Sequence, residues 1–326
     1  MYSRTSDFNS ILGKIIAGYI KEMKACGYKY IKGASLLKQF DILAAREDLS
    51  EVKLSKKLVL LWTKKRPNET DSTRNGRIST VRGLAKYIAR LGYEAFIYPA
   101  AMVKIERYSY LPYIFSKEEL RKMFTVCDKY PFSRLSPNRH IILPLLLRML
   151  YGCGLRISEA LNLKVGDIDP VRGALLIRDT KFKKERIVPM AETLTRRCLI
   201  YLNKIHRLSS SNSFFFPSPY GGAYKTSTIY KLFREVLWKA GISHSGKGPR
   251  LHDIRHSHAV GCLKRWVMDK KDITNLLPYL SAYLGHNDLR GTQHYLRLTT
   301  DLYPDIINCV EEKCSFLIPE VSYETD

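Results

Sequence analysis

Acidic residues are scarce in this 326-residue sequence. Only 31 Asp and Glu stand against 54 Lys and Arg, so the formal net charge is +23 at pH 7. An imbalance of this size favours a polyanionic partner, and nucleic acid is the default one. Long apolar runs are also missing: no stretch approaches the roughly 18 consecutive apolar residues that a membrane span needs. The N-terminal MYSRTSDFNS lacks a basic region followed by an apolar core, so we expect no secretory signal.

Metal-ligand spacing is absent as well. The seven cysteines, at positions 26, 127, 153, 198, 262, 309 and 314, form neither a C-x-x-C pair nor a Cys/His spacing typical of zinc. Unpatterned cysteines in odd number are typical of reduced, mostly buried thiols in a cytosolic protein. The sequence therefore predicts a cytoplasmic protein without a metal site.

Helical periodicity, by contrast, is plentiful in the first third of the chain. Apolar residues recur at i, i+3, i+4 and i+7 from Phe8 to Met23, and Gly27 closes the pattern. Further helical segments follow at about residues 31–45, 55–65 and 72–91, with no strand pattern between them. The pattern predicts a compact, all-α unit.

The length of the chain suits two domains, each able to bury its own core. The segment after Gly92 contains Pro99 and has weak periodicity, which is typical of a linker. We therefore predict a helical domain over residues 1–98, a linker over residues 99–111 and a second domain over residues 112–326.

The fourth helical segment carries a basic face. Its cationic side chains flank an apolar stripe and belong to Arg74, Arg77, Arg82, Lys86 and Arg90. A solvated surface is one interpretation. On a chain this basic, contact with DNA phosphates is at least as plausible, and we predict it for Arg74, Arg77, Arg82 and Lys86.

The second domain opens with a clear helix start. Ser116 and Glu119 have the spacing of a capping box. Residues 141–150, IILPLLLRML, are apolar on nearly all sides and predict a central buried helix. Two glycines then precede Arg156, which is expected to start a new helix with Glu159 one turn on. An arginine at such a position can bind an anion, although a structural Arg156–Glu159 pair is equally consistent.

A β-hairpin is the one clear strand pattern. Residues 174–177 and 187–189 are apolar and flank a polar turn. The turn holds Lys181, Lys183 and Lys184, which are either solvated or able to deliver an ammonium group to a phosphate. Residues 214–217 predict a third short strand.

Histidine and arginine share a helical face further on. The stretch LHDIRHSHA places His252 and Arg255 at i and i+3, with His256 repeating the chemistry of this face. Imidazole can move a proton near neutral pH, and a guanidinium can bind two phosphate oxygens. Incidental basic residues at a helix start are the alternative. Lastly, Tyr295 follows His286 by nine positions; taken alone, such a tyrosine is usually a core residue.

These motifs together resemble the tyrosine recombinase, or phage integrase, family. The resemblance rests on G-L-R-I-S-E-A-L around Arg156, T-K-F-K-K-E-R-I-V-P in the hairpin, H-D-I-R at His252, and L-G-H at His286 followed by Tyr295. It implies a mainly α fold with a small β-hairpin or sheet: an all-α DNA-clamping domain in front of an α+β catalytic domain.

The resemblance also implies a role for each residue. Arg156, Arg255 and His286 would clamp the phosphate, and Lys181 would be the general acid. His252 would act as the acid/base, and Tyr295 would be the nucleophile. Glu159 would orient Arg156 rather than act as a base. Lys181 is chosen among the three hairpin lysines because it begins the T-K-F-K-K-E-R motif.

The implied activity is site-specific recombination of double-stranded DNA through a 3′-phosphotyrosyl intermediate, without metal, ATP or cofactor. The implied assembly is a homotetramer on two DNA sites with paired half-sites, with possible accessory DNA-bending proteins. We expect a bacterial mobile-element enzyme of integration, excision or transposition, associated with the nucleoid. The alternatives are a monomeric DNA-relaxing topoisomerase with the same chemistry and a DNA-binding protein that keeps only the scaffold.

Overall fold

The chain divides into two compact units in the computed structural model: a first unit, Met1–Tyr110, and a second unit, Leu111–Asp326. The structure describes residues 8–47, 51–99, 111–178, 185–246, 248–286, 291, 292 and 295. Most of the expected linker, residues 100–110, lies outside the described residues.

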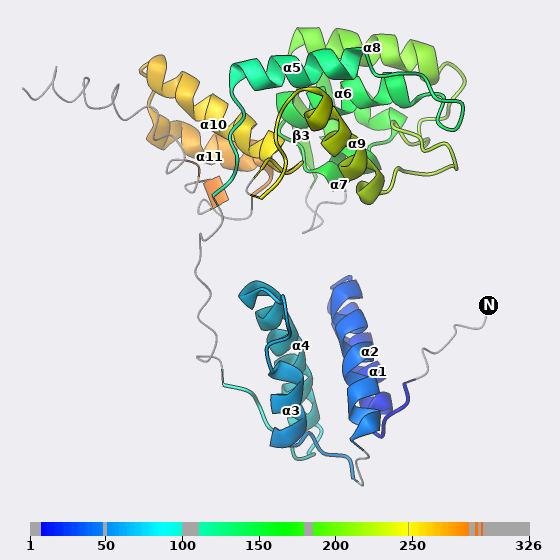
Figure 1. Cartoon of the computed structure of the whole chain (residues 1–326), viewed down its shortest axis with the longest axis vertical. Helices are drawn as coiled ribbons and strands as arrows, with labels where there is room; N and C mark the ends of the chain where they lie inside the picture. The colour runs from blue at the N-terminus through cyan, green and yellow to red at the C-terminus, as the bar shows by residue number, and fades with distance from the viewer. Residues whose placement is uncertain are drawn as a thin grey trace, which may run out of the picture. The chain divides into compact units, whose positions relative to one another are not determined.

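The first unit is built from the four helices that the sequence predicted (Figure 1). They are α1 (Gly13–Ala25), α2 (Ile31–Arg46), α3 (Lys56–Thr63) and α4 (Asp71–Arg90). Ser55 and Thr70 each accept a hydrogen bond from a backbone N–H of the first turn, which fixes the starts of α3 and α4. The apolar stripes meet in one core, where Phe40 and Leu84 are fully buried.

The second unit surrounds the apolar helix that the sequence singled out. This helix, α6 (Arg139–Gly152), packs against α5 (Lys117–Asp128), α8 (Glu192–Ile205) and α10 (Asp253–Met268). The remaining helices described are α7 (Ile157–Asn162), η2 (Val165–Asp167), α9 (Thr226–Lys239) and α11 (Ile273–Leu284). The predicted capping box between Ser116 and Glu119 starts α5. A helix as apolar as α6 needs neighbours on several sides, and it has them.

The sheet has three short antiparallel strands in the order β1-β2-β3. The predicted hairpin is confirmed as β2 (Ala174–Ile177) and β3 (Arg186–Pro189), with Ile177 opposite Arg186. The expected strand at residues 214–217 is wrong: β1 (Ile168–Asp169) is the third strand. Phe214 makes an isolated bridge to Lys164 and Pro217 makes one to Ala223, while Phe215 and Phe216 are fully buried in the core.

The fold class is thus mainly α with a small sheet, as predicted. Among the described residues, no helix combines the length and apolar character needed to cross a membrane.

Candidate active site

One buried carboxylate organises a group of arginines in the second unit. The side chain of Glu159 on α7 is 5% exposed. Arg156 donates to it from Nη1 (2.7 Å) and from its backbone N–H (2.9 Å). Arg186 on β3 donates through Nη1 (3.1 Å) and Nη2 (2.9 Å), and Nη1 of Arg255 on α10 lies 3.9 Å away. Three guanidinium groups therefore share one carboxylate, and this arginine cluster carries two positive charges in excess.

The same arginines bind the C-terminal end of α11. Carbonyl groups in the last turn of a helix have no partner within the helix and carry its negative dipole end. The hydrogen bonds run from Arg156 Nη2 to Gly285 O (2.9 Å), Arg186 Nε to Tyr283 O (2.8 Å) and Arg255 Nη2 to Leu284 O (2.6 Å). The helix can end there because Gly285 adopts a φ of 67°, in the left-handed region that glycine tolerates. Four elements, α7, β3, α10 and α11, thus converge on one point.

The charge state of Glu159 follows from these contacts. Burial on its own would raise the pKa of the carboxyl group, but the hydrogen bonds and charge of Arg186, together with Arg156, bring it to about 2. Glu159 therefore remains a carboxylate at neutral pH and holds the guanidinium groups in place.

Tyr295 lies beside the arginine cluster of its own chain. The residue is 2% exposed, and its hydroxyl oxygen lies 3.1 Å from Nδ1 of His256 on α10. The charge of Arg255 also acts on the phenol, and the ring stacks on that of His286 with centroids 6.0 Å apart. Burial raises the pKa of Tyr295, although Arg255 and Arg156 oppose the change. The phenol is therefore protonated at neutral pH and needs an acceptor for its proton before it can attack.

Two further histidines, His286 and His252, lie near Tyr295 and the arginine cluster. Burial and then the charge of Arg255 lower the pKa of His286 to about 4, and its Nδ1 lies 2.8 Å from Thr292 Oγ1. His252 is the residue that precedes α10, and its ring is perpendicular to that of His256 at 4.7 Å. Burial of part of the ring, followed by the charges of Arg255 and Arg156, lowers the pKa of His252 as well, although the residue is still exposed to solvent. Both imidazoles are neutral at pH 7.

The sequence-predicted residues of the second unit thus come together, with two additions. Arg156, Glu159, His252, Arg255, His286 and Tyr295 meet at the C-terminal end of α11. Arg186 and the contact of His256 with Tyr295 were not foreseen. Lys181, Lys183 and Lys184 lie outside the described residues. Within the described part of the chain, no group of three His, Cys, Asp or Glu side chains could hold a metal ion.

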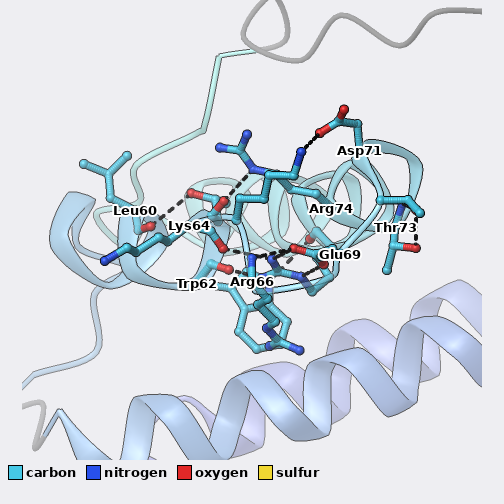
Figure 2. A network of polar contacts seen from close by, with 12 residues as sticks. Leu60, Trp62, Lys64, Arg66, Glu69, Asp71, Thr73 and Arg74 are labelled. Carbon is cyan, nitrogen blue, oxygen red and sulfur yellow. Dashed lines mark hydrogen bonds and ion pairs between the residues drawn. The ribbon is translucent and has the colours of Figure 1, made fainter.

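In the first unit, Arg77 does not lie on the basic face where the sequence placed it. Its side chain is 2% exposed and binds both carboxylate oxygens of Glu69, through Nε (2.7 Å) and Nη2 (2.6 Å). It also donates to the carbonyl oxygens of Trp62 and Lys64. Figure 2 shows the polar network that closes the loop between α3 and α4. The structure does not favour contact of Arg77 with DNA, because the loop folds back and encloses the guanidinium.

The other three candidates on α4 differ in exposure. Arg74 is half-buried and donates from Nε to Thr63 O at 2.9 Å. Arg82 is half-buried too, with its Nε enclosed and without a hydrogen-bond partner. Lys86 is exposed. Of the four, Lys86 has the side chain most open to a phosphate, and DNA contact by this face remains a prediction.

Several known proteins resemble this chain in sequence and in fold. The phage integrase family matches residues 114–301. A putative integrase/recombinase, y4rB, of Sinorhizobium fredii is 28% identical over 313 residues, which cover 93% of this chain and 98% of the relative. The tyrosine recombinase XerA of Pyrococcus furiosus is 34% identical over 191 residues, 58% of each chain. The fold resembles that of a lambda integrase tetramer bound to a Holliday junction, with a TM-score of 0.62 and 18% identity over 90% of this chain and 80% of the other.

The match of the family to more than half of the chain agrees with the geometry of the site. A buried tyrosine beside a cluster of arginines with excess positive charge is an arrangement suited to attack on a phosphodiester. The chain belongs to the phage integrase family, and it is a tyrosine-type site-specific recombinase that cuts and rejoins DNA.

Proposed function

We propose that Tyr295 is the nucleophile and that the arginine cluster holds the scissile phosphate. The observation that carries this proposal is the position of the Tyr295 hydroxyl, which lies 3.1 Å from Nδ1 of His256 and feels the charges of Arg255 and Arg156, two members of a cluster that has two positive charges in excess among the described residues. Phosphoryl transfer gathers negative charge on the non-bridging oxygens, so fixed cationic donors lower its barrier.

The roles divide as follows. Arg156 has the most exposed side chain of the three arginines in the cluster, at 30%. It contacts the phosphate together with Arg255 and His286. Glu159 orients the guanidinium groups, and Arg186 holds Glu159. The Tyr295 oxygen attacks phosphorus, the 3′-phosphotyrosyl bond forms and the bond to the 5′ oxygen breaks. Lys181 protonates the leaving 5′ oxygen, and the reverse attack by a 5′ hydroxyl rejoins DNA.

We further propose that recombination occurs in a homotetramer on two DNA sites, each with paired half-sites, and that the first unit clamps the duplex. A related fold forms a tetramer on a Holliday junction, which supports this assembly. Accessory DNA-bending proteins would assist where the sites must be brought together. Mobile-element DNA is the substrate that we favour, and action on it would associate the enzyme with the nucleoid in the cytoplasm.

A nicked suicide duplex tests the nucleophile. The duplex is selected from a random-sequence library by covalent capture with the wild-type protein and is then nicked beside the mapped cleavage position. Wild-type protein is expected to accumulate a covalent adduct in EDTA, because neither metal nor ATP takes part. Tyr295→Phe should bind the duplex with unchanged affinity and form no adduct. An adduct with Tyr295→Phe would overturn the assignment.

A plasmid with two copies of the captured site separates recombination from simple relaxation. We expect deletion products from direct repeats and inversion products from inverted repeats. Relaxation of a supercoiled plasmid without recombinant products, under conditions where both sites are occupied, would favour a topoisomerase with the same chemistry.

A further inference from the structure

We propose that His256 accepts the phenolic proton of Tyr295 during strand cleavage and returns it during rejoining. This inference rests on the proposed nucleophilic role of Tyr295. It assigns the proton transfer to the histidine that follows Arg255, rather than to His252 of the H-D-I-R motif.

The geometry at the hydroxyl group supports an acceptor role. The Tyr295 oxygen has a single hydrogen to donate, and Nδ1 of His256 lies 3.1 Å from it. The guanidinium of Arg255, whose charge also acts on this phenol, can only donate. It cannot accept the phenolic hydrogen, so this hydrogen can be directed to the imidazole nitrogen. The Nε2–H tautomer of His256 therefore fits the site.

Helical spacing explains why His256 reaches the tyrosine. His252 precedes the first residue of α10 and His256 lies four positions later, so the two rings are neighbours, 4.7 Å apart and perpendicular. The ring of His256 also contacts that of Tyr295, with centroids 5.4 Å apart. His252 is exposed, whereas His256 is half-buried between His252 and the tyrosine. His252 is thus open toward solvent, while His256 adjoins the nucleophile.

The charges around this pair favour transfer at the moment of attack. Among the described residues, the titratable or cationic groups at the phenol and its imidazole neighbours include His252, His286, Arg255, Arg156 and Arg186. Glu159 is the carboxylate that holds the arginines. Before attack, the excess positive charge disfavours an imidazolium ion. A bound phosphate adds negative charge, which offsets that of the guanidinium groups. His256 can therefore gain a proton once DNA is in place.

The step balances in both directions. In cleavage, the bond between Tyr295 Oη and phosphorus forms, the bond between phosphorus and the 5′ oxygen breaks, and the phenolic proton moves to Nδ1 of His256. A separate proton reaches the leaving 5′ oxygen. In rejoining, the 5′ oxygen bonds to phosphorus and its proton returns to the group that protonated it in cleavage, proposed above as Lys181. The bond between phosphorus and Tyr295 Oη breaks, and the imidazolium of His256 returns its proton to the departing phenolate.

His256→Asn is the informative variant, because the asparagine amide oxygen can occupy the place of Nδ1 and accept a hydrogen bond but cannot take up a proton at neutral pH. A positioned general base contributes about 10²–10⁴-fold to a rate. We therefore expect the single-turnover rate of adduct formation at pH 7 to fall by about that factor, with duplex affinity unchanged. His140→Asn, the same change on α6 outside the site, should keep the wild-type rate.

The pH profile separates proton transfer from positioning. Without an internal base, attack requires the phenolate, whose fraction rises about tenfold per pH unit below the phenol pKa. The deficit of His256→Asn should therefore shrink as the pH rises from 7 to about 9. A deficit that is the same at every pH would show that His256 only positions the tyrosine, and this outcome overturns the proposal.

A duplex with sulfur in place of the bridging 5′ oxygen locates the proton transfer. A thiolate leaves without protonation, because thiols are far more acidic than alcohols. Variants of the hairpin lysine should recover rate on this duplex, whereas His256→Asn should stay slow. Recovery of His256→Asn would place His256 at the leaving group instead. If Tyr295→Phe forms the adduct, the proposed function fails; if it does not, while His256→Asn behaves as wild type, only this inference fails.

Discussion

The two units each bury an arginine against a glutamate, but their charge balance differs. In the first unit one guanidinium, that of Arg77, meets one carboxylate, that of Glu69, and its remaining donors bind the carbonyl oxygens of Trp62 and Lys64. In the second unit three guanidinium groups meet the single carboxylate of Glu159. A balanced pair closes a loop, whereas an excess of fixed cations creates a place for an anion. The number of arginines per carboxylate therefore separates structural arginines from candidate phosphate ligands here.

The two units also differ in their histidine content. All eight histidines of the sequence lie between His140 and His294, so the first unit has none. Three of them, His252, His258 and His286, have lowered pKa values, and His252 and His286 lie beside the arginine cluster. Only the second unit therefore contains side chains whose ordinary titration range lies near neutrality.

Breaking the balanced pair should have the largest effect on stability. Arg77→Ala removes the cation that binds both oxygens of the Glu69 carboxylate, which keeps the hydrogen bond from the backbone N–H of Arg66. Breaking a buried ion pair typically costs about 3–5 kcal/mol of folding free energy. We expect urea unfolding followed by the fluorescence of Trp62, in a protein with Trp238→Phe and Trp266→Phe, to show this loss. Arg74→Ala removes one hydrogen bond to a carbonyl and should cost clearly less. Equal losses for the two variants would contradict the structural role of Arg77.

Removing one cation from the arginine cluster should act on the rate instead. Arg156→Ala is expected to slow adduct formation by about 10²–10³-fold, while Arg186 still holds Glu159 and the duplex affinity stays within a few-fold. Single-turnover cleavage and gel-shift titration measure the two quantities. The matched control is Arg178→Ala, an exposed arginine paired with Asp167. If Arg156→Ala loses affinity and rate by the same factor, the arginine serves binding alone.

Acid should destabilise the second unit before the first. The pKa of His286 is about 4 in the folded protein and near 6.5 when unfolded, so the unfolded state binds more protons between these values and stability falls as the pH drops through them. Hydrogen bonding to Arg77 lowers the pKa of Glu69 to about 2, so the stability contributed there is lost only below about pH 4.5.

Two single-tryptophan proteins measure this difference. Between pH 7 and 5, the protein that keeps Trp238 should lose on the order of 1 kcal/mol per perturbed histidine, since these rings are partly exposed. The protein that keeps Trp62 should not change over the same range. A parallel loss in both proteins would show that the histidines are not the cause.

The smallest effect is expected on the basic face of α4. Lys86→Ala should weaken duplex binding several-fold and reduce the slope of log affinity against log salt by about one, the value for one phosphate contact. Lys57→Ala removes an exposed lysine from α3 of the same unit. If both variants give the same change, the net charge of the unit matters rather than this face.

Much of the fold and of the candidate site could be predicted, because the sequence patterns that indicate them lie within single segments of the chain. The helices of the first unit follow from apolar periodicity, α6 from a stretch that is apolar on nearly all sides, and the hairpin from two short apolar runs around a polar turn. Arg156, Arg255 and His286 stand next to glycines or helix starts that mark them. Arg77 was misplaced because periodicity describes one helix and not the loop of residues 64–70 that covers it. Arg186 and His256 gain their importance from long-range pairing with Glu159 and Tyr295, which no spacing along the chain displays.

The most direct test of the central claim is mass spectrometry of the trapped adduct. After nuclease and protease digestion, the account predicts a nucleotide remnant joined through a 3′-phosphate to the peptide that contains Tyr295. The same digestion of the Arg156→Ala protein should give this peptide in far lower yield at equal times. A remnant on any other of the 21 tyrosines, or on serine, would contradict the account.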